Sequence, residues 1–186
     1  MSAISASQVK ELREKTGLGL MDCKKALEGA NGDMELAIEE LRKTSGVKAS
    51  KKSGRSAADG LIGIESKAQD IFMIEVNCET DFVARDDSFV AFTNETLQAY
   101  AENPESSLEE LLNNGIEDNR EKLVQKLGEN IVVRRVAKTE NSSTVGSYLH
   151  SNQKIGCIVS LDGGDESLAN DIACLLYTSP SPRDRG

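Results

Sequence analysis

The sequence predicts an α+β fold, in which an N-terminal three-helix bundle is followed by a linker and an antiparallel sheet with helices on one side. Three observations predict it. Apolar residues recur at helical spacing through residues 1–45, with a break after each short run. Two pairs of β-rich runs are each joined by a short polar turn, as in hairpins. The order β-β-α-α-α-β-β-β-α over residues 60–173 lacks the strand–helix alternation of a parallel sheet.

The first 45 residues predict three short helices. Ser5 and Gln8 have the spacing of a capping box, and Asp33 can cap the third helix after the break at Asn31 and Gly32. The core of so small a bundle is thin, near the lower size limit for independent folding. The predicted inward faces comprise Val9, Leu12 and Thr16; Cys23, Ala26, Leu27 and Ala30; and Met34, Ala37, Ile38 and Leu41.

Residues 46–59 predict a flexible basic linker, because they are rich in Ser, Gly and Lys. No acidic residue lies between Glu40 and Asp59. The basic run is either a contact with an acidic or phosphate-bearing surface or a solvated linker, and its composition favours the solvated linker. The basic residues are Arg42, Lys43, Lys48, Lys51, Lys52 and Arg55.

Residues 60–173 predict the α+β domain. The runs 61–66 and 71–76 form one predicted hairpin, and the runs 145–150 and 154–161 form another, with a further strand over 130–138. Between them lie an amphipathic helix that contains Phe89 and Phe92, a short helix capped by Ser107 and Glu110, and a helix that ends at Gly128. A last helix begins after residue 163.

Residues 174–186 do not continue this pattern. An apolar helix face stops, and a Ser/Pro/Arg string follows that contains two of the three prolines of the chain. We therefore expect residues 174–186 to be a non-native tail, which implies that the natural chain is longer.

Composition argues against several classes of function. The net charge of −9 disfavours nucleic-acid binding through a broad basic surface. No run approaches the ~20 apolar residues of a membrane span, and the N-terminus does not have the order of a signal or transit peptide. We expect a cytoplasmic protein that binds neither membrane nor nucleic acid directly. The four scattered cysteines form no CxxC pair, so no metal site is indicated.

Enzyme chemistry is also limited. His150 is the only histidine, and nothing near it resembles a nucleophile elbow. The loops GxxxxGK[ST] and GxGxxG, which bind nucleotides, are missing from the sequence. We therefore expect no catalytic residues, no enzyme activity and no cofactor.

The run NCETDFVARDD, residues 77–87, places Phe82 on an acidic turn at the exit of a predicted buried strand. Either Phe82 is an exposed anchor for a partner, or it packs back onto Phe89 while Asp86 and Asp87 complement the dipole of the next helix. A calcium loop is a third possibility, but its characteristic spacing is absent.

Two long stretches carry a family resemblance. Residues 12–43, LREKTGLGLMDCKKALEGANGDMELAIEELRK, and residues 75–85, EVNCETDFVAR, resemble two signatures of the bacterial-type translation elongation factor Ts family, in the same order. The resemblance extends through GENIVVRRVA and GSYLH to about residue 173. It implies a ubiquitin-associated-like bundle over residues 1–45, and over residues 60–173 the first half of a core built from two related α+β halves.

The family resemblance also implies a function: guanine-nucleotide exchange on elongation factor Tu, with GDP release promoted by disturbing the partner's Mg²⁺ and phosphate site. The implied partner-binding residues are Thr80, Asp81, Phe82 and Val83 and, more weakly, Leu18, Leu20, Met21 and His150. Leu20 stands where the family favours methionine or another bulky apolar residue. For Leu18, Leu20 and Met21, packing in the core of the bundle is an equally good explanation. For His150, an ordinary surface position in a hairpin is an equally good one.

Two other classes of function stay open. The first is a ubiquitin-associated-like interaction module without exchange activity. The second is a metal-dependent hydrolase that would use Glu79, Asp81, Asp86 and Asp87, which the single histidine and the lack of a second acidic cluster disfavour.

Overall fold

The computed structural model describes residues 4–140 and 144–178, and it confirms the α+β class. The bundle contains α1 (Ala6–Thr16), α2 (Leu20–Gly29) and α3 (Met34–Lys52). Its caps are those that the sequence predicts: Ser5 and Gln8 form a capping box, and Asp33 accepts hydrogen bonds from two backbone N–H groups of the first turn of α3. The bundle core comprises Val9, Leu12, Leu18, Cys23, Ala26, Leu27, Ala37 and Leu41.

Helix α3 is longer than predicted. The boundary expected at residue 45 is a helical position, and residues 46–52 of the predicted linker extend the helix. Ala49 in this extension and Ser45 directly before it are buried, and Gly46 lets the Glu121 carboxylate of another helix approach closely. Tertiary packing therefore stabilises a helix in a segment whose Ser and Gly content alone favours a linker.

The central sheet is antiparallel, in the order β1–β2–β3. It consists of β1 (Asp59–Lys67), β2 (Asp70–Cys78) and β3 (Val132–Lys138), with a register shift on β2 between Glu75 and Val76. Phe72, Ile74 and Val76 belong to the main buried cluster, whereas the alternate residues of β2 lie on the opposite face.

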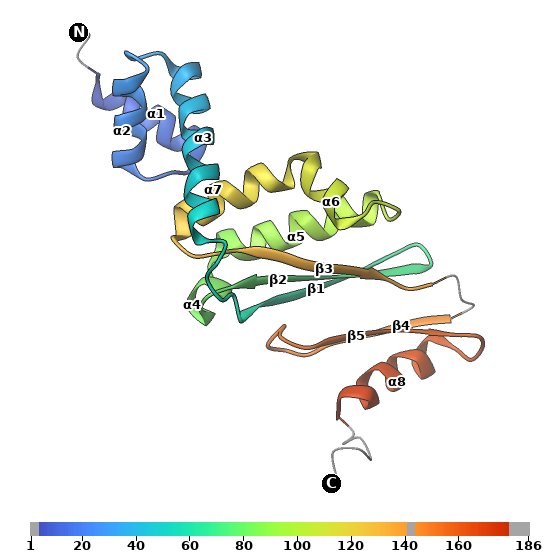
Figure 1. The fold of residues 1–186 in the computed structure, drawn as a ribbon. Coiled ribbons are helices and arrows are strands. Elements are labelled where there is room, and N and C mark those ends of the chain that lie inside the picture. The colour runs from blue at the N-terminus through green and yellow to red at the C-terminus, as the bar shows by residue number, and fades with distance from the viewer. Residues whose placement is uncertain (1–3, 141–143, 179–186) are drawn as a thin grey trace.

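Helices cover one face of this sheet (Figure 1). They are α5 (Asp87–Glu102), α6 (Leu108–Leu111) and α7 (Glu117–Leu127). The predicted capping box of Ser107 and Glu110 begins α6, and a kinked segment with Gly115 at φ 94° joins α6 to α7. Helix α7 packs along α3 and also contacts α5, so it connects the bundle to the helices that cover the sheet.

The α+β class is as predicted, but the strands form two antiparallel sheets rather than a single sheet with helices on one side. Strands β4 (Thr144–Leu149) and β5 (Gly156–Leu161) form a separate two-stranded sheet on the other face of β1–β2–β3, and α8 (Glu166–Thr178) packs on its outer side (Figure 1). The approach is close, since a Cβ on Gly156 would lie 2.9 Å from Ile62. Both faces of the central sheet are therefore covered, which explains why β2 reads as a continuous apolar run rather than an alternating one.

Helix α8 passes the point where the tail was expected to begin. Residues 174–178 form its last turns, and residues 179–186 of the predicted tail lie outside the described residues. Across residues 4–140 and 144–178, none of the helices is of a length and hydropathy that would let it cross a bilayer.

Candidate partner-binding site

The TDFV stretch forms a single helical turn, α4 (Asp81–Ala84), directly after β2. Thr80 is its N-cap, and its hydroxyl accepts a 3.5 Å hydrogen bond from the backbone N–H of Val83. Asp86 then caps α5 by accepting from the N–H of Ser88 at 2.8 Å. Two helix starts within seven residues lead the chain from the end of β2 into α5, which runs back over the sheet, and α4 lies at this bend (Figure 1).

Phe82 points away from the protein interior. Its side chain is 83% exposed, whereas Ala84, two residues later, is buried. Phe89 is 0% exposed and occupies the core beneath α5. The structure therefore contradicts the alternative in which Phe82 packs back onto Phe89. An aromatic side chain held so fully in water has the character of an anchor for another molecule.

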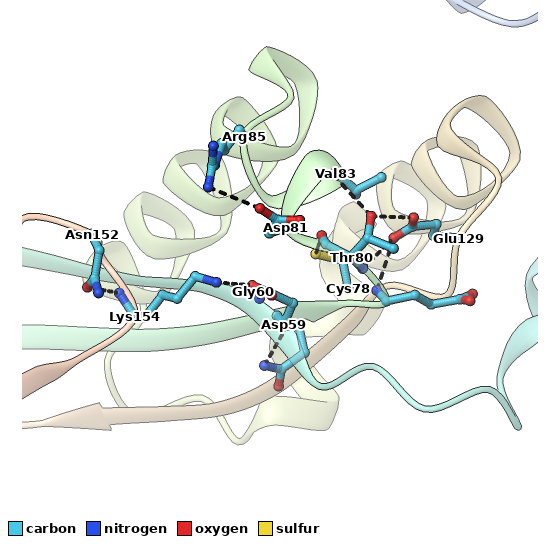
Figure 2. Close-up of polar contacts among 12 residues, drawn as sticks. Asp59, Gly60, Cys78, Thr80, Asp81, Val83, Arg85, Glu129, Asn152 and Lys154 are labelled. Carbon is cyan, nitrogen blue, oxygen red and sulfur yellow. Dashed lines mark hydrogen bonds and ion pairs between the residues drawn. The ribbon is translucent and has the colours of Figure 1, made fainter.

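The carboxylate of Glu129, which follows the C-cap of α7, holds this turn in place. Glu129 Oε2 accepts hydrogen bonds from the backbone N–H groups of Glu79 and Thr80, each at 3.0 Å. Its Oε1 accepts from the Thr80 hydroxyl at 2.7 Å. Figure 2 shows Thr80 and Glu129 facing each other across this contact. Hydrogen bonds to an ionised acceptor are stronger than neutral ones, so the turn is firmly positioned.

The acidic residues of the turn are already partnered within the protein. Glu79 accepts from the backbone N–H of Asn130 at 2.7 Å and pairs with Arg55 at 3.5 Å. Asp81 pairs with Arg85 at 3.0 Å. Among residues 4–140 and 144–178, no group of three or more potential ligands is arranged to hold a metal ion. The geometry is thus that of a braced protein turn.

The thiol of Cys78 lies buried beneath this turn, and burial changes its pKa. Cys78 donates a hydrogen bond to the backbone carbonyl of Thr80 at 3.2 Å. Burial, reinforced by the nearby negative charge of Glu129, raises the pKa of Cys78 to about 12. The group is therefore a neutral thiol at physiological pH, and it packs under α4 rather than acting as a nucleophile.

The predicted loop of the bundle divides into two parts. Leu18 is 3% exposed and belongs to the bundle core, which favours the packing alternative for this residue. Leu20 and Met21, at the start of α2, are 54% and 61% exposed. An exposed pair of bulky apolar side chains at a helix start is available for contact with a partner.

His150 lies in the turn between β4 and β5. Its Nδ1 is hydrogen-bonded to the Tyr148 hydroxyl at 2.8 Å, and its backbone N–H donates to the carbonyl of Ile155 at 2.9 Å. The ring is partly exposed. Both a hairpin role and a partner contact are therefore compatible with its position.

The structure brings the β4–β5 turn to the same end of the central sheet as α4. Lys154 pairs with Asp59 at 2.7 Å, and Asp59 is opposite Cys78 in the β1–β2 register, just before α4 (Figure 2). The hydrogen bond from Lys154, together with that from the Gly60 N–H, holds the pKa of Asp59 below its usual value. Residues 80–83 and His150 therefore share one end of the domain, whereas Leu20 and Met21 lie on the bundle.

Sequence reasoning missed Glu129 and Asn130. Asn130 is 2% exposed, and its side-chain amide donates to the backbone carbonyls of Ser53 and Arg55 at 3.4 and 2.8 Å. The only available signal was a polar pair between Gly128, which ends α7 with φ 82°, and the apolar run of β3. That signal does not identify their partners, because Ser53, Arg55, Glu79 and Thr80 lie far from this pair in the sequence.

Comparison with known proteins supports the resemblance. A family model described as Elongation factor TS matches residues 79–178. Curated proteins named Elongation factor Ts are 54% identical over 93% of this chain in Marinobacter nauticus, covering 60% of that protein, and 49% identical over 97% in Idiomarina loihiensis, covering 63%. That of Arthrospira platensis is 48% identical over 93% of this chain and 73% of its own length. The chain thus spans about 60% of the length of most of these relatives, and it belongs to the elongation factor Ts family.

Proposed function

We propose that this chain acts as a guanine-nucleotide exchange factor for elongation factor Tu, with Phe82 as a wedge at the partner's Mg²⁺ and phosphate site. The observation that carries the proposal is the combination of an 83% exposed phenyl ring with a turn braced by three hydrogen bonds to Glu129. A flexible turn would lose binding free energy on ordering, whereas a braced turn presents the ring already in place.

The proposed mechanism depends on charge. In a GTPase, Mg²⁺ bridges the phosphates of the nucleotide and the side chains of the protein, and it neutralises much of the phosphate charge. Insertion of Phe82 between the elements that hold the ion weakens that arrangement, so GDP leaves faster. Coupling between two ligands of one protein is reciprocal. Incoming nucleotide therefore weakens the affinity of elongation factor Tu for this chain by the same ratio, the chain dissociates, and the exchange cycle is complete.

Other exposed groups extend the proposed surface. Leu20 and Met21 form a second contact on the bundle, and His150 forms a third at the same end of the central sheet as α4. On this proposal the chain performs no covalent chemistry, needs no cofactor and binds elongation factor Tu rather than nucleic acid or membrane. It would act in the cytoplasm, where that partner works.

The test is the release of fluorescent GDP from elongation factor Tu at increasing concentrations of the 186-residue chain. We expect the chain to accelerate release, and Phe82→Ala to lower the maximal rate at saturation. Leu168→Ala, which truncates an apolar side chain that is 47% exposed on α8, is the matched control and should leave the maximal rate unchanged. An unaltered maximal rate with Phe82→Ala at saturation would defeat the wedge proposal.

The alternative is a ubiquitin-associated-like interaction module without exchange activity. The exposure of Leu20 and Met21 on the bundle favours it. It predicts that the chain binds elongation factor Tu without accelerating GDP release, and that binding weakens with Met21→Ala but not with Phe82→Ala.

A further inference from the structure

Residues 125–130, which comprise the end of α7 and the connection toward β3, contact three separate parts of the protein. We refer to them as the bracket segment. Gln125 reaches the bundle, Glu129 reaches the turn before α4, and Asn130 reaches the chain that leaves α3. All three contacts are made by side chains within six consecutive residues, so the segment joins elements that are far apart in the sequence.

On the bundle side, the contact lies next to the exposed pair of α2. Gln125 Nε2 donates to Asp22 Oδ2 at 3.0 Å, and Lys48 Nζ donates to the same oxygen at 3.0 Å. Asp22 directly follows Leu20 and Met21 in the chain. Gln125 also accepts a hydrogen bond from the buried Ser45 of α3. The start of α2 is therefore tied to α7 independently of the chain connection through α3.

On the turn side, Glu129 accounts for the position of α4. Its carboxylate accepts from two consecutive backbone N–H groups and one hydroxyl, all within three residues of Phe82. Glu79 returns the contact by accepting from the backbone N–H of Asn130. Asn130 in turn donates to the carbonyls of Ser53 and Arg55 beyond α3. Reciprocal bonds of this kind resist both rotation and translation of the turn.

We propose that the bracket segment holds the exposed pair Leu20 and Met21 at a fixed separation from Phe82, so that both engage elongation factor Tu as one preorganised surface. This inference rests on the proposed exchange function. When two contact surfaces belong to one rigid body, the second can engage the partner without a further loss of conformational entropy. A bundle on a flexible linker would lose that entropy during binding. Gln125, Glu129 and Asn130 are therefore positioning residues, which act through the side chains that touch the partner.

The first experiment removes the brace of the turn in the 186-residue chain. Glu129→Ala should lower the maximal rate of GDP release about tenfold, because hydrogen bonds to a charged acceptor are lost. The same variant should speed amide hydrogen exchange at Glu79 and Thr80 about tenfold or more. Glu129→Gln, which keeps an acceptor oxygen, should restore part of both. Glu95→Ala removes an exposed carboxylate of α5 and is the matched control.

For Glu129, the concentration dependence of GDP release separates a positioning role from loss of folded protein. A variant that merely unfolds in part has a higher half-saturating concentration and an unchanged maximal rate. Glu129→Ala should instead lower the maximal rate, and adding it to Phe82→Ala should cause no further loss. Gln125→Ala should raise the half-saturating concentration several-fold at an unchanged maximal rate, which partial unfolding would also do, so the double variant with Met21→Ala decides. If Gln125 positions the exposed pair, Met21→Ala should cost less affinity in the Gln125→Ala background than in the wild type, whereas after partial unfolding its cost would be the same in both.

The outcomes distinguish the two proposals. If the wild-type chain does not accelerate release, the exchange function falls and this inference falls with it. If the wild-type chain is active and Phe82→Ala is not, but Glu129→Ala and Gln125→Ala both behave as wild type, the exchange function stands and only the bracket is overturned. Unchanged amide exchange at Thr80 in Glu129→Ala would likewise overturn it.

Discussion

The contrast between Phe82 and Phe89 gives the sharpest test of how the chain uses its aromatic residues. Both lie within eight positions of each other, yet Phe82 is 83% exposed and Phe89 is 0% exposed. Replacing each by alanine removes the same atoms. The two substitutions should therefore separate binding from stability, since one side chain contributes to a surface and the other to the core.

The expected magnitudes follow from burial. Phe89→Ala should lower the free energy of unfolding by about 3–5 kcal/mol, because it removes a buried ring and leaves a cavity. Phe82→Ala should change the free energy of unfolding by less than about 0.5 kcal/mol, as for most surface substitutions. In the proposed complex with elongation factor Tu, where Phe82 would be a buried aromatic anchor, its loss should cost about 2–4 kcal/mol of binding free energy, which corresponds to roughly 30- to 1,000-fold in Kd.

Urea denaturation followed by circular dichroism measures the first quantity, and titration of nucleotide-free elongation factor Tu measures the second. The reasoning is refuted if Phe82→Ala destabilises the free chain by more than about 1.5 kcal/mol, because that value is typical of a core residue. It is also refuted if Phe82→Ala leaves the Kd within about threefold of wild type, because the exposed ring would then have no partner.

Three further substitutions or treatments test the fold. Gly60 has φ 148°, and a Cβ there would lie 2.1 Å from the Val76 carbonyl oxygen. Gly60→Ala should therefore lower the free energy of unfolding by ~2 kcal/mol or more. Scanning calorimetry should show a Tm lower by roughly 4–8 °C. The hydrogen bond from Gln125 holds the pKa of Asp22 below its usual value. Burial alone would raise this pKa, but the Gln125 bond and the contacts with Lys48 together outweigh it. The stabilisation by Asp22 is thus present above about pH 4 and is lost as pH falls through that lowered pKa; Asp22→Asn should flatten the acid side of a plot of urea midpoint against pH. Because burial raises the pKa of Cys78 to about 12, iodoacetamide at pH 8 should label it only in denaturant, as mass spectrometry would detect.

Each of these has a contradicting result. An unchanged Tm in Gly60→Ala would mean that β1 and β2 separate more easily than their register implies. If the urea midpoint of Asp22→Asn falls with decreasing pH as steeply as that of the wild type, carboxylates other than Asp22 cause the acid sensitivity. Labelling of native Cys78 as fast as that of a free peptide thiol would mean that α4 does not cover it.

Much of the local structure was predictable because it depends on neighbours in the sequence. The capping boxes at Ser5 and Ser107 and the cap at Asp33 each involve residues two or three positions apart. The hairpin of β1 and β2 follows from two apolar runs and a polar turn. The TDFV turn as a candidate site depended on the resemblance to a family, because an aromatic residue on an acidic turn has a packing explanation as well as a binding one.

The amino-acid sequence by itself determined the α+β class, the three-helix bundle, the hairpins and the stretch that carries Phe82, since helical and strand periodicity and capping act over a few residues. Tertiary structure alone decided that α3 continues into the predicted linker, that five strands divide into two sheets, and that Phe82 faces water. It also decided that Glu129 braces a turn 49 and 50 positions away in the chain. The physical reason is distance: the free energy of these arrangements comes from contacts between residues that meet only when the whole domain has folded, and no local pattern encodes them.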